Sequence, residues 1–262
     1  MTTFFSGLVL ACALLGARGI HAEELPLAPV QLSVLSARGF LAAMQLVAPA
    51  YEEATGVHIR LQEAPSMGRS PEAIPNRLAR RESVDIVLME DAALSRLINQ
   101  SEVQKHSRVE LGKSFIAMAV RQGAVKPDIG TMKAFRSALL DAQSLAYSDS
   151  SSGLYVAHLL FPRMKLAVQL KAKSKTVTGE SVGAVVARGE AQLGFQQLSE
   201  LMRVPGIVIV GLIPDSVQKM TLYSAGIISH SAHPSESAAL VKYLASPHAH
   251  DAIERSGLIP VH

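Results

Sequence analysis

The feature that most constrains the fold is a regular alternation of short apolar runs and amphipathic stretches. Runs of about four to eight apolar residues are typical of buried strands, and apolar residues spaced three and four apart are typical of helices. Strands separated by helices at this rhythm predict parallel α/β sheets. The predicted strands are 31–35, 58–63, 86–89, 114–120, 144–147, 193–196, 207–212 and 221–228. The predicted helices are 40–55, 70–80, 92–99, 132–140, 154–160, 182–188, 236–245 and 247–256.

The chain has no internal repeat, no low-complexity block and no proline-rich linker. A domain boundary must therefore lie within strands, and the predicted strands 114–120 and 221–228 are the best candidates for two crossings of one hinge. We expect lobe I to contain residues 23–115 and 222–262, and lobe II to contain residues 116–221.

The first 22 residues have the features of a secretory signal. An apolar core at 4–15 is followed by small residues up to Ala22, and it is too short to span a bilayer. We expect cleavage after Ala22 and export to the periplasm; a lipoprotein signal ending at Cys12 is the alternative. Because Cys12 is the single cysteine, cleavage leaves no disulfide, no thiolate nucleophile and no cysteine metal site.

The charge balance argues against a nucleic-acid partner. Lys and Arg number 25 against 22 Asp and Glu, a net charge of +3, and no cluster of basic and aromatic residues accompanies this small excess. After the signal, no apolar run is long enough for a membrane span. His248 and His250 lie two apart in a predicted helix and so point in different directions. We expect no metal and no cofactor.

Four turns, each at the end of a predicted strand or the start of a predicted helix, combine hydroxyl residues with glycine, and two of them carry an arginine. Helix starts present free N–H groups and the positive end of the helix dipole, which suits an anion. Arginine adds a planar donor fork for a carboxylate. Each turn alone is also consistent with ordinary N-capping, but four of them at a sheet edge favour a ligand site. The candidate ligand-binding residues are Ser36, Arg38, Gly39, Ser66, Arg69, Ser151, Ser152, Gly153, Ser181 and Val182.

The order of these segments resembles that of the periplasmic molybdate-binding proteins. The resemblance covers essentially the whole mature chain. It implies the type II periplasmic solute-binding fold, an α/β architecture in which two lobes are joined by a two-strand hinge and an oxyanion binds in the cleft between them. The segments that carry it are 32–40, 84–91, 111–114, 151–155, 181–187 and 194–195.

Three positions depart from that family and change the expected ligand. The family places a serine hydroxyl on the oxyanion where this chain has Gly39, preceded by Arg38. A serine-rich segment of the family has become 66–69, which ends in Arg69, and the family's ligand tyrosine corresponds roughly to Gln197. Two added arginines suit a larger, more highly charged anion such as a tricarboxylate. Gln197 therefore joins the candidate binding residues.

The family also includes proteins that have left transport for catalysis. The resemblance to them implies a monomeric isomerase that moves a C=C bond of a small tricarboxylate by allylic proton transfer, without a cofactor. The alternative is a non-catalytic binding protein that delivers molybdate, another oxyanion or a tricarboxylate to an ABC permease.

An allylic proton transfer needs one positioned base. Glu90, at the end of the predicted strand 86–89, is the candidate catalytic base, although it is equally placed to cap the helix that follows. Glu180 and His158 are lesser candidates. Tyr155 and Tyr223 either reach the cleft or pack in the core.

Overall fold

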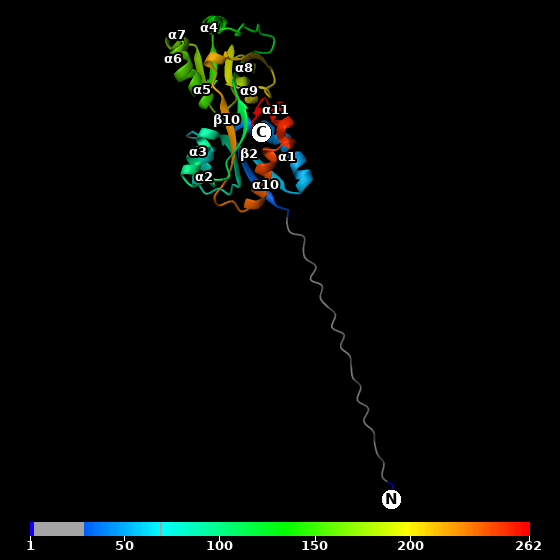
Figure 1. Ribbon diagram of the computed structural model, residues 1–262. Coiled ribbons are helices and arrows are strands. Elements are labelled where there is room, and N and C mark those ends of the chain that lie inside the picture. Colours follow the sequence, from blue (N-terminus) through cyan, green and yellow to red (C-terminus); the bar gives the residue numbers. More distant parts are fainter. Residues whose placement is uncertain (3–28, 69) are drawn as a thin grey trace.

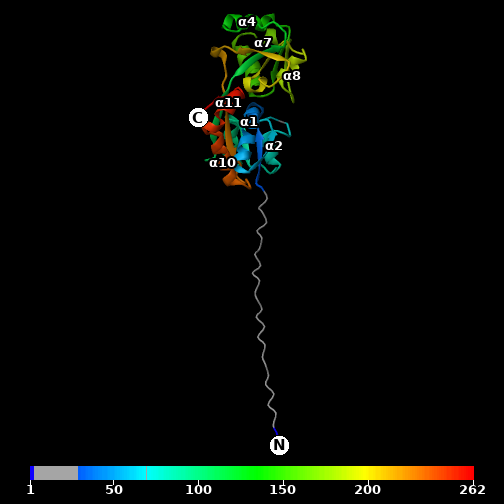
Figure 2. The same ribbon diagram turned by 90° about the vertical axis from the view of Figure 1, so that its right-hand side faces the viewer.

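The computed structural model describes residues 1–2, 29–68 and 70–262, and it contains two α/β lobes, each built on its own sheet (Figures 1 and 2). Nearly all of the predicted signal, and Arg69, lie outside the described residues. Among the helices of the described part of the chain, none combines the length and the apolar character needed to cross a membrane.

Lobe I is built on a six-stranded sheet with the order β11-β4-β10-β3-β1-β2. Its strands are β1 (Gln31–Ser36), β2 (His58–Glu63), β3 (Ile86–Glu90), β4 (Val109–Ser114), β10 (Thr221–Ile227) and β11 (Ile259–Pro260). Its helices are α1 (Arg38–Thr55), α2 (Ile74–Ala79), α3 (Asp91–Asn99), α10 (Pro234–Leu244) and α11 (Pro247–Arg255). The core of this lobe contains Phe40, Met44 and Leu88, all fully buried.

Lobe II is built on a five-stranded sheet with the order β7-β6-β8-β5-β9. Its strands are β5 (Ile116–Arg121), β6 (Leu145–Ser148), β7 (Ser174–Val177), β8 (Leu193–Gln197) and β9 (Ile207–Leu212). Its helical segments are α4 (Met132–Asp141), α5 (Ser151–Tyr155), the π-helical turn η1 (Val156–Leu160), α6 (Phe161–Arg163), α7 (Ala167–Lys171), α8 (Val182–Ala187), α9 (Leu198–Leu201) and the 3₁₀ turn η2 (Asp215–Val217). Phe135 and Phe195 pack edge to face at its centre.

The expectation of parallel sheets holds for only part of each lobe. Strands β1, β2 and β3 are mutually parallel, as are β6, β7 and β8, and helices connect them. Strand β10 is antiparallel to β3 and β4, and β5 is antiparallel to β8 and β9. Strands β10 and β5 each enter their sheet from the other lobe, so no helical crossover sets their direction. The short strand β11 is also antiparallel to β4, and it follows α11 within lobe I.

The two lobes meet where the predicted strand 114–120 is broken in two. Ser114 ends β4 in the first sheet and Ile116 begins β5 in the second. The carboxamide of Gln218 accepts a hydrogen bond from the backbone N–H of Ile116 and donates one to its carbonyl, which holds the returning chain against this crossing. The chain re-enters the first sheet at Thr221, which pairs with Ser114. We retain 23–115 with 222–262, and 116–221, as the proposed bounds of the two lobes.

Candidate functional site

A cavity of about 230 Å³ lies between the lobes, at the carboxyl ends of strands from both sheets. Lobe I contributes the segment between β1 and α1, the loop after β2, the end of β3 and one residue of β10. Lobe II contributes the segments after β6 and β7, the end of β8 and the start of α9. The residues that line the cavity are Ala37, Arg38, Gly39, Glu63, Pro65, Ser66, Met67, Gly68, Ser70, Glu90, Ser148, Asp149, Ser150, Thr178, Gly179, Glu180, Gln196, Glu200 and Tyr223.

The start of α1 presents backbone donors to this cavity. Its N-cap residue, Ala37, has no side chain that can cap the helix, and its carbonyl accepts from the N–H groups of Phe40 and Leu41. The N–H groups of Arg38 and Gly39 have no hydrogen-bond partner among the described residues. A long helix with open N–H groups at its positive end is suited to a carboxylate.

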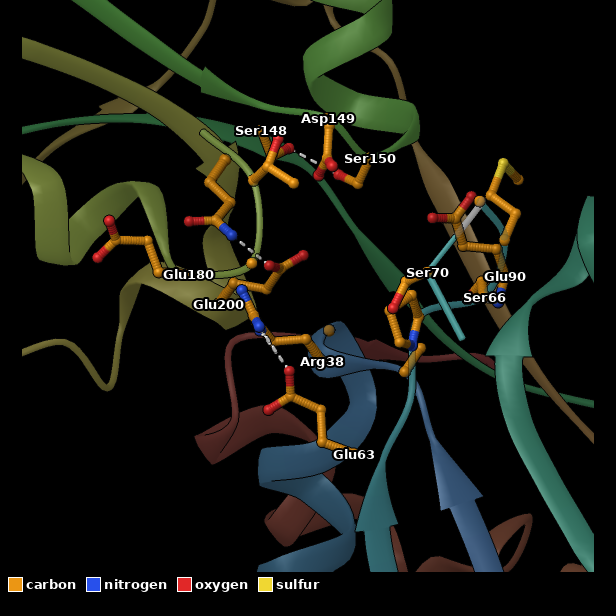
Figure 3. A pocket seen from close by; sticks show the side chains of 18 of the residues that line it. Arg38, Glu63, Ser66, Ser70, Glu90, Ser148, Asp149, Ser150, Glu180 and Glu200 are labelled. Atoms are coloured by element: carbon orange, nitrogen blue, oxygen red, sulfur yellow. Dashed lines mark hydrogen bonds and ion pairs between the residues drawn. The ribbon is translucent and has the colours of Figure 1, made fainter. Parts of the chain in front are cut away.

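Arg38 is the cation that this helix adds to the cavity. Its Nε donates to Glu63 Oε1 at 2.7 Å, and its Nη2 lies 2.6 Å from the same oxygen. Figure 3 shows the guanidinium between Glu63 of lobe I and Glu200 of lobe II. Because Arg38 is about one-third exposed, part of its donor fork is open to a ligand in the cleft.

Glu90 reaches the cavity from the end of β3. Its backbone N–H donates to Ser66 Oγ at 3.1 Å, and its carboxylate accepts a hydrogen bond from the hydroxyl of Ser151 in lobe II. Burial raises the pKa of Glu90 above its ordinary value, while the hydrogen bond from Ser151 and the positive charge of Lys219 oppose the shift. A carboxyl group with a raised pKa is better matched to accepting a proton near neutral pH.

Glu200 is a second buried carboxyl group in the cavity, and it was missed in the sequence. It lies in the first turn of α9 and accepts a hydrogen bond from the Nε2 of Gln196. Burial raises its pKa to about 7, against the opposing charge of Arg38. The signal that could have found it is its position three residues after Gln197, at the carboxyl edge of β8, where ligands bind in open α/β folds.

The serine turn after β6 forms a chain of hydroxyls. Ser148 Oγ lies 2.6 Å from Ser150 Oγ, which lies 3.3 Å from Ser152 Oγ. Ser148 and Ser150 line the cavity, whereas the predicted Ser152 and Gly153 are buried and do not line it. A Cβ at position 153 would overlap the backbone carbonyl of Ser148, so glycine is needed there for α5 to approach β6 closely.

The predicted donors at the start of α8 are engaged within the protein. Gln196 Oε1 accepts from the backbone N–H of Val182 at 3.0 Å and from Ser181 Oγ at 3.2 Å. Ser181 Oγ also accepts from the N–H of Gly183, so it is a helix cap. A side-chain amide therefore occupies the helix start where the sequence predicts an anion.

Two further predicted residues are buried beside the cavity and do not line it. Ser36 is fully buried and donates to the carbonyl of Ala37. Gln197 is 2 % exposed and donates through Nε2 to Thr221 Oγ1 at 2.7 Å, which links β8 to the returning strand β10. The structure thus brings Arg38, Gly39, Ser66 and Glu90 together around one cavity.

The lesser base candidates have different surroundings. Glu180 lines the cavity, but both of its oxygens accept from the guanidinium of Arg188, at 2.8 and 3.0 Å, which lowers its pKa. A paired carboxylate with a lowered pKa is a weaker base than Glu90. His158 is exposed on a second cavity of about 610 Å³, which shares Glu90 with the first and also contains Arg96 and Lys219.

Carboxyl groups outnumber cations along the first cavity, yet most of their charge is balanced. Glu63 is paired with Arg38, and Glu180 is paired with Arg188. Burial raises the pKa of Glu200 to about 7, so near neutral pH part of it is in the neutral, proton-donating form. The site can therefore receive an anion through the Arg38 guanidinium, the open backbone N–H groups of α1 and the protonated form of Glu200.

Comparison with known proteins identifies the family of this chain and agrees with the two-lobe fold described above. A family model described as bacterial extracellular solute-binding protein matches residues 32–259. A curated protein named aconitate isomerase, from a Pseudomonas species, is 61% identical over 230 residues, which cover 88% of each chain. The periplasmic molybdate-binding protein of Azotobacter vinelandii has a TM-score of 0.69 at 19% identity, covering 87% of this chain and 98% of that one. The substrate-binding domain of a putative molybdenum ABC transporter from Clostridium difficile has a TM-score of 0.68 at 17% identity, covering 89% and 100%.

Proposed function

Since this chain belongs to the bacterial extracellular solute-binding protein family, we propose that it is a member that acts as an enzyme, an aconitate isomerase that interconverts trans-aconitate and cis-aconitate. The observation that carries the proposal is the 61% identity to a protein named aconitate isomerase across 88% of both chains. The family acts outside the cytoplasm, and we propose the periplasm, with the signal ending at Ala22. The enzyme works as a monomer on a tricarboxylate anion.

The substrate binds between the lobes, with its carboxylates on donors from both. One carboxylate binds at the start of α1, on the open N–H groups of Arg38 and Gly39 and on the Arg38 side chain. Others bind near Ser66 and Arg69 in lobe I and near the serine turn at Ser151 in lobe II. The remaining predicted residues act indirectly, as caps and close packing that hold these donors in place: Ser36, Ser152, Gly153, Ser181, Val182 and Gln197.

Glu90 is the base of an allylic proton transfer. Its carboxylate takes a proton from the methylene carbon of trans-aconitate, and the electron pair of that C–H bond spreads over three carbons and the attached carboxylates. The proton then returns to the former vinyl carbon, and the double bond forms between the other two carbons. The single and double C–C bonds exchange places while the protein holds the carboxylates fixed. The arrangement of the bound carboxylates therefore determines which isomer is released. Residues 29–262 contain no cysteine, so a thiolate addition route has no nucleophile there.

The test is an assay of the purified protein with trans-aconitate, followed by NMR. The proposal predicts conversion to cis-aconitate until the two isomers reach equilibrium, in the absence of added cofactor. A folded sample that produces no cis-aconitate overturns it.

The alternative, a binding protein for an ABC transporter, rests on the family and on its molybdate-binding structural neighbours. Titration calorimetry with molybdate, tungstate, sulfate and tricarboxylates separates the two functions. Submicromolar binding of molybdate, about −8 kcal/mol or tighter, together with no turnover of trans-aconitate, would favour transport.

A further inference from the structure

Tyr223 is almost wholly enclosed, yet its hydroxyl has no partner in the described part of the chain. The residue is 2 % exposed, its ring packs at a tilt against Phe40 with the ring centres 6.4 Å apart, and it lines the cavity between the lobes. Buried tyrosine hydroxyls usually find a hydrogen-bond partner, because a lost one is costly. An enclosed donor that opens only onto a ligand cavity points to a partner that the ligand supplies.

Gly39 provides the space that this hydroxyl occupies. A Cβ added at position 39 would overlap both Oη of Tyr223 and the ring carbon that carries it. The absence of a side chain at position 39 lets a phenol from β10 reach the start of α1. Glycine is required at position 39 for this close approach rather than for its own backbone angles.

Tyr223 also lies directly beside the proposed base. In the antiparallel pairing of β10 with β3, Tyr223 is opposite Glu90. Residues opposite each other in such a pair point to the same face of the sheet, with Cβ atoms about 5 Å apart. A substrate carboxylate whose oxygen binds Tyr223 therefore lies next to the carbon from which Glu90 takes a proton.

We propose that Tyr223 is a further catalytic residue, whose hydroxyl donates a hydrogen bond to the substrate carboxylate on which negative charge develops as Glu90 removes the proton, and that Gly39 is its positioning residue. This rests on the proposed isomerase function. When the methylene C–H bond breaks, the electron pair moves partly into the adjacent carboxylate, which gains enediolate character. A donor fixed at that oxygen, next to the open N–H groups of α1, stabilises the intermediate more than the substrate.

The surroundings of Tyr223 keep it in the donor form. Burial raises the pKa of its phenol well above the usual value, and the nearby charges of Glu200 and Glu90 raise it further. The phenol therefore holds its proton throughout the pH range in which the enzyme works. It serves as a donor only, and the proton that moves between carbons is carried by Glu90.

The test is Tyr223→Phe, which keeps the ring and removes only the hydroxyl. We expect kcat for trans-aconitate to fall by about tenfold or more, since hydrogen bonds to charged acceptors are the strong ones. We expect the dissociation constant of the saturated analogue propane-1,2,3-tricarboxylate to change by less than about threefold. The thermal midpoint should stay close to the parental value, because the hydroxyl faces the cavity and has no hydrogen-bond partner in the described part of the chain whose loss would destabilise the fold. A hydroxyl with a structural role predicts the opposite, a lower midpoint with kcat retained.

Gly39→Ala is the second variant, because it keeps the hydroxyl and displaces it. It should lower kcat at least as much as Tyr223→Phe, and the two changes together should cost less than the product of their separate effects. Tyr243→Phe is the matched control: Tyr243 stacks on His248 away from the cavity, and its variant should keep parental kcat. If the parent protein does not convert trans-aconitate, the proposed function fails. If the parent does so and Tyr223→Phe keeps kcat within twofold, only the role of Tyr223 is overturned.

Discussion

The hydroxyl of Ser151 in lobe II donates a hydrogen bond to the carboxylate of Glu90 in lobe I. This contact crosses the cleft and joins the proposed base to the helix start that carries the serine turn. It also favours the ionised form of Glu90, against the burial that raises the pKa of this carboxyl group. A substrate that binds next to Glu90 therefore meets a base already oriented by the opposite lobe.

Replacing Glu90 by glutamine is expected to abolish turnover and keep substrate binding. The amide has nearly the shape of the carboxylate but cannot accept a proton as a base, and general-base catalysis contributes about 10²–10⁴ in rate. We expect kcat to fall at least about a hundredfold, while calorimetry with trans-aconitate gives an affinity close to that of the parent.

Glu53→Gln is the matched control, since Glu53 is exposed on α1 and away from the cavity. If Glu90→Gln turns over at the parental rate, Glu90 is not the base, and its side chain does not cap α3 either, since it makes no capping hydrogen bond. The base is then to be sought at Glu200, which has a raised pKa, before Glu180, which is paired with Arg188.

Removing the Ser151 hydroxyl should move the pH profile in a defined direction. The hydrogen bond from Ser151 lowers the pKa of Glu90, so its loss in Ser151→Ala raises that pKa. The base must be ionised to act, and the acidic limb of kcat/KM against pH should therefore shift to higher pH. An acidic limb that stays in place or moves to lower pH contradicts the assignment of that limb to Glu90.

The parts of the site that could be predicted are those that a local sequence pattern determines. Arg38, Gly39 and Ser66 follow strands of the parallel part of lobe I and Glu90 ends one, and the carboxyl ends of parallel strands lie at one edge. A local pattern of strand, turn and helix is enough to place such residues.

The residues that were missed or left open depend on pairing that local patterns do not contain. Tyr223 lies in the middle of β10, a strand that returns from lobe II, and its position beside Glu90 follows from an antiparallel register across 133 residues of sequence. Gln196 fills the start of α8 from a neighbouring strand, so the predicted donors of Ser181 and Val182 are already occupied. Glu200 has a raised pKa only because the fold buries it.

The two arginines predicted to bind the ligand, Arg38 and Arg69, provide a third prediction. Arg38→Ala and Arg69→Ala should each lower kcat/KM by about tenfold or more without unfolding the protein, since a bidentate charge-assisted contact is lost. Lysine at either position should restore only part of the activity, because it lacks the planar fork. Activity within twofold of the parent in both alanine variants, with thermal midpoints unchanged, would place these arginines outside the site.

Glu200 should couple ligand binding to proton uptake. Its pKa in the free protein is about 7, so near pH 7 a substantial fraction is ionised. A tricarboxylate bound beside it adds negative charge, which raises the pKa of Glu200 and draws in a proton. The positive charge of Arg38 lowers the pKa of Glu200, whereas the negative charges of Glu90 and Glu63 raise it, as the bound ligand does. We expect uptake of a fraction of one proton at about pH 7 to 8 and less at pH 5.5, where Glu200 is already protonated.

The measurement is calorimetry with propane-1,2,3-tricarboxylate in buffers of different ionisation enthalpy. The slope of the observed binding enthalpy against the buffer ionisation enthalpy gives the number of protons exchanged. Glu200→Gln should remove most of this slope and still bind the ligand, whereas Glu53→Gln should leave it unchanged. Proton release by the parent, or a slope that survives Glu200→Gln in full, contradicts the prediction.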